Sequence, residues 1–122
     1  MRFKAIVDGQ VYAVEVRDDL LQDAADFHAR LDRDMDRGWQ MSRQYVEHPD
    51  RLQRCQIVAD RLLTSIMQGN QASAMLLAGY IALRMPGATG VDIDASGEMQ
   101  NTELLYDRDA GTPPPPAGPG AR

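Results

Sequence analysis

The dipeptide Asp8-Gly9 constrains the fold most, because it stands between two runs of alternating apolar residues. A type I′ turn needs positive φ at both central positions, and Asp-Gly is a strong signal for such a turn. A two-residue loop fixes the register, so the sequence predicts a β-hairpin over residues 1–17 with Arg2 opposite Glu15. Because a lone hairpin is marginally stable, its apolar face must pack on a later part of the chain. That face consists of Phe3, Ala5, Val7, Tyr12 and Val14.

Residues 18–47 have the periodicity of one long helix, because apolar residues recur in steps of three and four from position 20 to position 46. Asp19 and Gln22 have the spacing of a capping box at its start. Gly38 lies inside this segment, where it either kinks the helix or divides it in two. His48-Pro49 ends it, because a residue that precedes proline avoids the α region.

Residues 49–85 read as a helical pair joined at Gly69-Asn70, which stops the first helix and caps the second. The second helix, 71–85, is apolar on nearly all sides: between positions 72 and 83 only Ser73 and Gly79 are not plainly apolar. Such a helix is buried either inside the monomer or against another chain. The sequence therefore predicts a protein partner or a homodimer through the region 71–85.

Residues 90–106 form a second β-like stretch with a hairpin loop at Ala95-Ser96-Gly97, in which glycine takes the left-handed position. This register sets Asp94 opposite Glu98, which repel. The segment 107–122 contains four consecutive prolines and reads as a disordered Pro/Gly-rich tail. We therefore expect an α+β fold in a single domain over 1–106, with both β regions in one small sheet beside the helices.

The loop 92–103 carries the sharpest chemical pattern, and it resembles the calcium loop of EF-hand proteins. Acidic and hydroxyl residues, a glycine and a final glutamate stand where that loop has its oxygen ligands and its sharp turn. The flanks differ, because Pro86-Gly87 precedes the loop where an EF-hand has a helix, and no second loop is present. The resemblance implies calcium as a ligand, with an exposed acidic hairpin as the alternative. The candidate metal ligands are Asp92, Asp94, Ser96, Glu98 and Glu103.

Two further sets of residues have the composition of a reactive site. His28, Asp32 and Asp36 share one helix face, where imidazole and carboxylates suit either a first-row metal or a solvated face with ion pairs. Cys55 and a histidine make a thiol–imidazole pair conceivable, but Cys55 lies on an apolar stripe, where a buried structural cysteine is usual. A small-molecule enzyme that uses His28 and its neighbouring acids is therefore a distant alternative.

Arginines give the helix after Pro49 a basic edge at Arg51, Arg54 and Arg61. We expect this edge to dock an acidic surface, such as the protein's own helix over 18–47. Large side chains at Trp39, Met41 and Tyr45 suit either an interface or the core, and helical spacing favours the core.

Charge and motifs narrow the function class. The chain has 18 acidic and 13 basic residues, which gives a net charge of −5 and does not favour nucleic acid or an anionic membrane. No export signal opens the sequence and no apolar run reaches the ~20 residues of a membrane span, so we expect a soluble cytoplasmic protein. No phosphate loop, nucleophile elbow or zinc motif is present. The sequence favours a non-enzymatic accessory or interaction protein, with calcium binding as the alternative.

Overall fold

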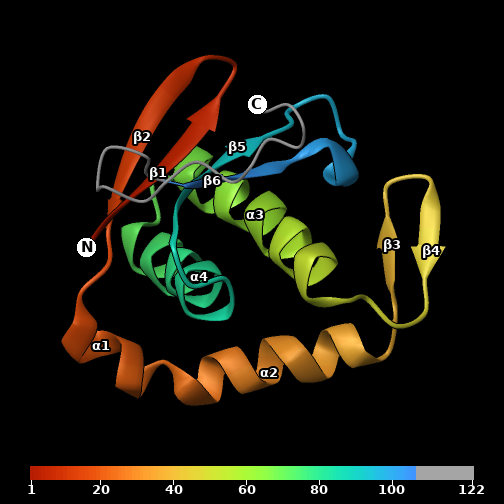
Figure 1. Cartoon of the computed structure of the whole chain (residues 1–122), viewed down its shortest axis with the longest axis horizontal. Helices are drawn as coiled ribbons and strands as arrows, with labels where there is room; N and C mark the ends of the chain where they lie inside the picture. The colour runs from red at the N-terminus through yellow and green to blue at the C-terminus, as the bar shows by residue number, and fades with distance from the viewer. Residues whose placement is uncertain (107–122) are drawn as a thin grey trace, which may run out of the picture.

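The computed structural model describes residues 1–106, and its architecture is α+β (Figure 1). The predicted Pro/Gly-rich tail over 107–122 lies outside the described residues. The described elements, in chain order, are β1 (Arg2–Val7), β2 (Gln10–Glu15), α1 (Asp18–Asp23), α2 (Ala25–Asp36), β3 (Trp39–Met41), β4 (Gln44–Val46), α3 (Arg51–Met67), α4 (Gln71–Arg84), β5 (Ala88–Ile93), the 3-10 helix η1 (Met99–Asn101) and β6 (Glu103–Tyr106).

Both β regions join in one four-stranded sheet of order β2-β1-β5-β6, as predicted. The hairpin β1–β2 has the expected register, with Arg2 opposite Glu15 and a turn in which Asp8 and Gly9 have φ of 52° and 79°. Strand β5 runs parallel to β1 on its other side, and β6 is antiparallel to β5. This order leaves β2 at one edge of the sheet and β6 at the other.

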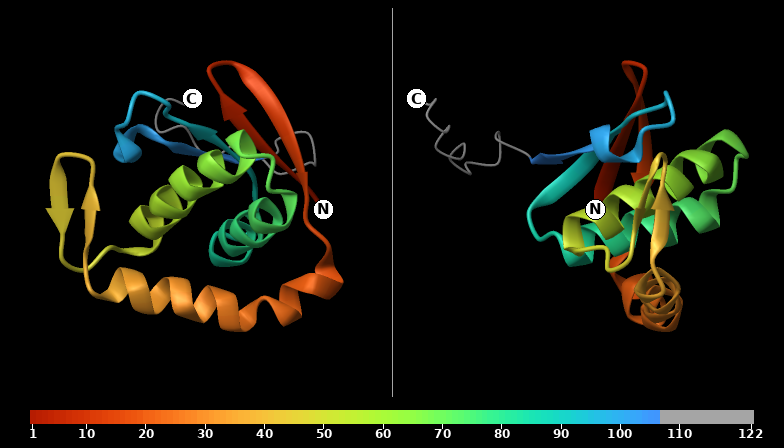
Figure 2. Two further views of the ribbon diagram at one scale, coloured as in Figure 1. Left: turned by 180° about the vertical axis from the view of Figure 1, so that it is seen from behind. Right: turned by 90° about the vertical axis from the view of Figure 1, so that its right-hand side faces the viewer.

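Helices α3 and α4 form an antiparallel pair on one face of the sheet, and α2 crosses beneath them (Figures 1 and 2). The apolar face of the first hairpin packs on this pair, with Phe3 fully buried and Val14 8% exposed. Each of the two helices begins at a residue that caps it: Asp50 and Gln53 form a capping box, and Asn70 accepts a bond from the Ser73 amide. The apolar helix α4 is central, and its Leu77, Ala78 and Ile81 are buried.

The long helix predicted over residues 18–47 is wrong. The segment instead forms two helices, α1 and α2, which are separated at Ala24. The second helix ends at Asp36 and is followed by a separate hairpin, β3–β4. Gly38 has φ of +96°, a left-handed conformation that ends a helix and that glycine adopts most readily. The spacing of apolar residues by three and four did not distinguish a continued helix from a hairpin over residues 39–46. Trp39 and Val46 would share one face of a helix, and in the hairpin they are cross-strand partners.

The tight loop predicted at Ala95-Ser96-Gly97 is also wrong in its register. The strands pair with Asp92 opposite Glu103, so the connection runs over residues 94–102 and contains η1. Polar bonds hold this longer connection in place. The Thr102 hydroxyl accepts from the Asp94 amide at 3.0 Å, and the Gln56 side chain donates to the Gln100 and Thr102 carbonyl oxygens at 3.2 and 3.1 Å. A local pattern of turn residues does not reveal partners as distant as Gln56.

Candidate functional site

The loop 92–103 does not gather its predicted ligands around one point in the described structure. Asp92 and Glu103 are cross-strand partners on β5 and β6. The Asp94 carboxylate instead accepts bonds from its own loop: from the Ser96 hydroxyl at 2.7 Å and from the Glu98 amide at 3.1 Å. These bonds lower the pKa of Asp94, with the Ser96 hydroxyl as the largest cause. Ser96 therefore supports Asp94, and Glu98 contributes its amide to the same turn.

Among residues 1–106, no group of three or more histidine, cysteine, aspartate or glutamate side chains is arranged to hold a metal ion. The loop lies between two strands, whereas an EF-hand loop lies between two helices. Calcium binding by Asp92, Asp94, Ser96, Glu98 and Glu103 stays a prediction of the sequence, with no support from this geometry.

The acidic face predicted around His28 is occupied by basic and phenolic groups from two other helices. Asp32 of α2 accepts from Arg54 of α3 at 3.1 Å, and from Tyr80 and Arg84 of α4 at 2.5 and 2.8 Å. Arg54 also reaches Asp36 at 2.6 Å. The basic edge therefore docks on the protein's own acidic helix through Arg54, as predicted from sequence.

The electrostatics of the Asp32 cluster (Asp32, Arg54, Tyr80 and Arg84) indicate a structural role, in which the cluster joins α2 to α3 and α4. Burial raises the pKa of the Asp32 carboxyl, but the three donors together outweigh that cost and hold the pKa below its usual value. Burial and the bond to Asp32 both raise the pKa of the Tyr80 hydroxyl. A carboxylate held by three donors is a poor general base, because its lone pairs are engaged.

His28 and Cys55 are both buried, and neither has the environment of a reactive group. The His28 ring lies 2.9 Å from the Leu76 carbonyl oxygen through Nε2 and stacks edge-on against Tyr80. Burial lowers the pKa of His28, so the neutral ring is favoured and Nε2–H donates to Leu76. Burial also raises the pKa of the Cys55 thiol to about 11, which keeps it protonated near neutral pH.

The large side chains of the β3–β4 hairpin divide between core and surface. Met41 is fully buried, Trp39 packs partly buried against the core, and Tyr45 is 55% exposed. The hairpin is tied to the loop 94–102 by Ser42, whose hydroxyl donates to the Gly97 carbonyl oxygen and accepts from the Met99 amide at 3.0 Å.

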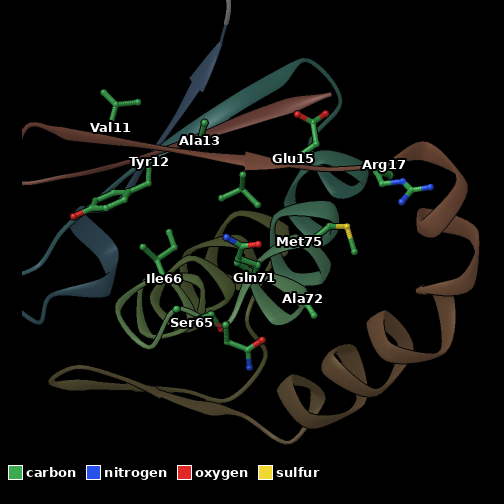
Figure 3. Close-up of a pocket in the computed structure, with 14 residues that line it drawn as sticks. Val11, Tyr12, Ala13, Glu15, Arg17, Ser65, Ile66, Gln71, Ala72 and Met75 are labelled. Atoms are coloured by element: carbon green, nitrogen blue, oxygen red, sulfur yellow. The ribbon is translucent and has the colours of Figure 1, made fainter.

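The strongest candidate for a binding site is a groove of about 770 Å³ beside β2 (Figure 3). Its upper wall is β2 and the residues that follow, and its lower wall is the end of α3 with the start of α4. Tyr12 lies on the helix side of β2, whereas Val11, Ala13 and Glu15 project from the opposite side (Figure 3). The groove is mostly apolar: β2 contributes Tyr12 and Val14, α3 contributes Ile66, and α4 contributes Met75.

Among residues 1–106, no strand pairs with the outer edge of β2, which lies beside the groove. The Val16 amide donates to the Met1 carbonyl oxygen at 2.7 Å, and the Met1 amine donates back to Val16 at 2.6 Å. Bonded pairs alternate along an antiparallel ladder, so the even-numbered residues of β2 bond to β1. The amide and carbonyl groups of Val11, Ala13 and Glu15 therefore point away from the sheet, toward the open side of β2.

Sequence reasoning missed this groove because it depends on which strand lies at the edge. The hairpin signal gives the register of β1 and β2 but does not say which of the two takes β5 as its neighbour. The predicted contact region 71–85 does contribute, since Gln71, Ala72, Ala74 and Met75 line the lower wall.

Comparison with protein-family models, curated proteins and solved structures finds no match to this chain. Among the described residues, no helix is both long enough and apolar enough to cross a membrane.

Proposed function

We propose that this protein is a non-enzymatic interaction protein that binds an extended segment of a protein partner along β2. The observation that carries the proposal is the groove of about 770 Å³ beneath β2, a sheet edge with which no strand of the described part of the chain pairs. Strand addition uses such a combination: the edge supplies main-chain hydrogen bonds and the groove receives every second side chain of the added segment.

The groove favours an apolar segment in a β conformation. Val11, Ala13 and Glu15 each offer one outward donor and one outward acceptor, so the ligand needs free amide hydrogens at every second residue. The side chains that point toward the helices would meet Tyr12, Ile66 and Met75, which are apolar. A ligand with alternating apolar residues and no proline at its bonding positions meets both requirements.

Two chemical features argue against an enzymatic role. The Cys55 thiol is held protonated by burial, and the Asp32 carboxylate is engaged by Arg54, Tyr80 and Arg84. Both groups act in packing or in joining helices. The charged residues that border the groove are Glu15 and Arg17. Binding at this surface therefore needs no chemistry beyond hydrogen bonding and burial of apolar area.

Selection from a random peptide library tests the proposal. The full chain is immobilised at a dilute surface density, and recovered peptides are titrated against the ¹⁵N-labelled protein. We expect peptides with alternating apolar residues, and we expect the amides of Val11, Ala13 and Glu15 to become protected from hydrogen exchange. Recovery of no binder, or of binders that leave these three amides unchanged, would contradict the proposal.

A further inference from the structure

We infer that the segment accepted by β2 is β2 of a second copy of this chain, paired antiparallel with Ala13 on a two-fold axis. This inference rests on the proposed function, because it names the occupant of the same edge and groove. The two four-stranded sheets would join into one continuous sheet of eight strands.

The backbone fits this arrangement completely. With Ala13 opposite its own symmetry copy, Val11 lies opposite Glu15 of the second copy. These are the residues whose amide and carbonyl groups point outward, so all of them gain partners in bonded pairs. No free group at the centre of the edge is left without a bond.

The side chains fit the same register. On the helix side of the sheet, Tyr12 of each copy lies opposite Val14 of the other. An aromatic residue opposite a β-branched residue is a favourable cross-strand pair. Both side chains already line the groove, so the second copy adds apolar area where each monomer is open. On the other side, the small Ala13 allows close approach at the axis.

Charge excludes the register that places Glu15 on the axis, because the two carboxylates would then face each other. With Ala13 on the axis, Glu15, which is the charged residue of β2, lies opposite the apolar Val11 of the second copy.

Apart from the charged Glu15, the edge of β2 lacks the features that prevent sheet edges from pairing with each other. Its register with β1 runs unbroken from Arg2–Glu15 to Val7–Gln10, without a bulge. The strand has no proline and no lysine, and Val11 is 56% exposed. Natural edges are usually protected by such residues or by a covering element.

Among the described residues, the groove is lined by β2, Arg17 and the adjoining ends of α3 and α4 with the link between them, so the interface is small. Small interfaces are typical of transient complexes, and we expect a dissociation constant on the order of 10 µM. Sedimentation velocity of the full chain from about 1 to 500 µM therefore spans monomer and dimer. A single monomeric species over this whole range would overturn the inference.

Substitution at the axis tests the geometry. In Ala13→Glu the new carboxylate stands beside Lys4 of the same molecule, which supports the monomer, but opposite an identical charge in the dimer. We expect the dissociation constant to rise about tenfold or more. Leu83→Glu is the matched control, because Leu83 is 46% exposed on α4 away from the groove, and this variant should dimerise like the original chain.

A mixture of variants tests the two-fold axis itself. Alone, Ala13→Glu and Ala13→Lys should each dimerise about tenfold more weakly than the original chain. At a concentration where each is monomeric alone, the mixture should form a heterodimer, because opposite charges then face each other across the axis. Failure of the mixture to associate, or unchanged dimerisation of Ala13→Glu, would overturn the inference. A chain that stays monomeric but protects Val11, Ala13 and Glu15 with selected peptides refutes this inference alone and leaves the proposed function standing.

Discussion

The hairpin over residues 1–17 and the segment over residues 18–46 show how differently two neighbouring regions depend on the rest of the fold. In the hairpin, the Asp8-Gly9 turn sets the register by itself, and the sheet then buries the face that the register defines. In the segment, the periodicity fits a helix throughout, yet the chain forms α1, α2 and β3–β4. A turn that fixes the backbone locally determines the structure of its segment. A periodic pattern of apolar residues does not, because the structure it forms also depends on what those residues pack against.

The largest expected effect lies in the first region. Phe3→Ala removes a fully buried ring from the sheet and leaves a cavity above α3 and α4, so we expect a loss of about 3–5 kcal/mol in the free energy of unfolding. Urea denaturation measures it. Val11→Ala, at an exposed position of the same hairpin, should cost less than about 0.5 kcal/mol at low protein concentration. A loss under about 1 kcal/mol for Phe3→Ala would show that the hairpin does not contribute to the core.

The next effect tests how α2 is attached. Asp32→Asn removes the charge that Arg54 and Arg84 share, and we expect a loss of about 2–3 kcal/mol, below the value for a fully buried pair because the side chain is 29% exposed. Asp34→Asn, at an exposed position of α2, serves as the control. Equal midpoints for the two variants in urea would mean that the Asp32 cluster does not hold α2.

A smaller effect should mark the point where the second region departs from a helix. Gly38→Ala imposes a side chain at φ of +96° and places its methyl 2.7 Å from the Tyr45 ring carbon Cζ, so we expect a loss of about 1–2 kcal/mol. Gly97→Ala has a similar φ of +103° but open space around it, and it isolates the backbone cost. The comparison fails if Gly38→Ala stabilises the protein or raises its helical circular dichroism, since the helix would then extend through residue 38.

The smallest effect is a pH dependence within α2. Burial lowers the pKa of His28 below 6.5, so the unfolded chain takes up this proton first as the pH falls. Stability should therefore be full above pH 6.5 and decrease below it, by at most about 1.4 kcal/mol at pH 5.5. An NMR titration of the His28 ring checks the direction. A midpoint at or above 6.5 would show that the ring is not held neutral.

Much of the fold was predictable, and the successes share a physical cause. The first hairpin, the helices α3 and α4, and the cap at Asn70 each depend on residues within a few positions of one another. The cap at Asp50 was not predicted, because the helix was expected to begin at Pro49. The failures depend on distant partners. Ser42 binds Gly97 and Met99, and Gln56 holds the carbonyl oxygen of Thr102, so both irregular segments are stabilised across the molecule.

In the candidate site, too, the features that depend on neighbouring residues were predictable and those that depend on distant partners were not. The alternation that turns Val11, Ala13 and Glu15 outward follows from the Asp8-Gly9 turn, and so does the apolar face that carries Tyr12 and Val14. The basic edge at Arg54 and its acidic partners were also visible as opposite charges at helical spacing. The spacing of acidic residues in the loop 92–103 was less informative, because Asp94 uses its carboxylate to close its own turn.

The sequence by itself determined the register of the first hairpin, the limits of the helical pair and the apolar character of α4, because turns, caps and periodicity act over short distances. Only the tertiary structure decided that β5 pairs in parallel with β1 and that β2 is therefore left at the edge, above the ends of α3 and α4. Strand order depends on contacts between residues 86 positions apart, such as Ala5 with Val91, and no local preference encodes them.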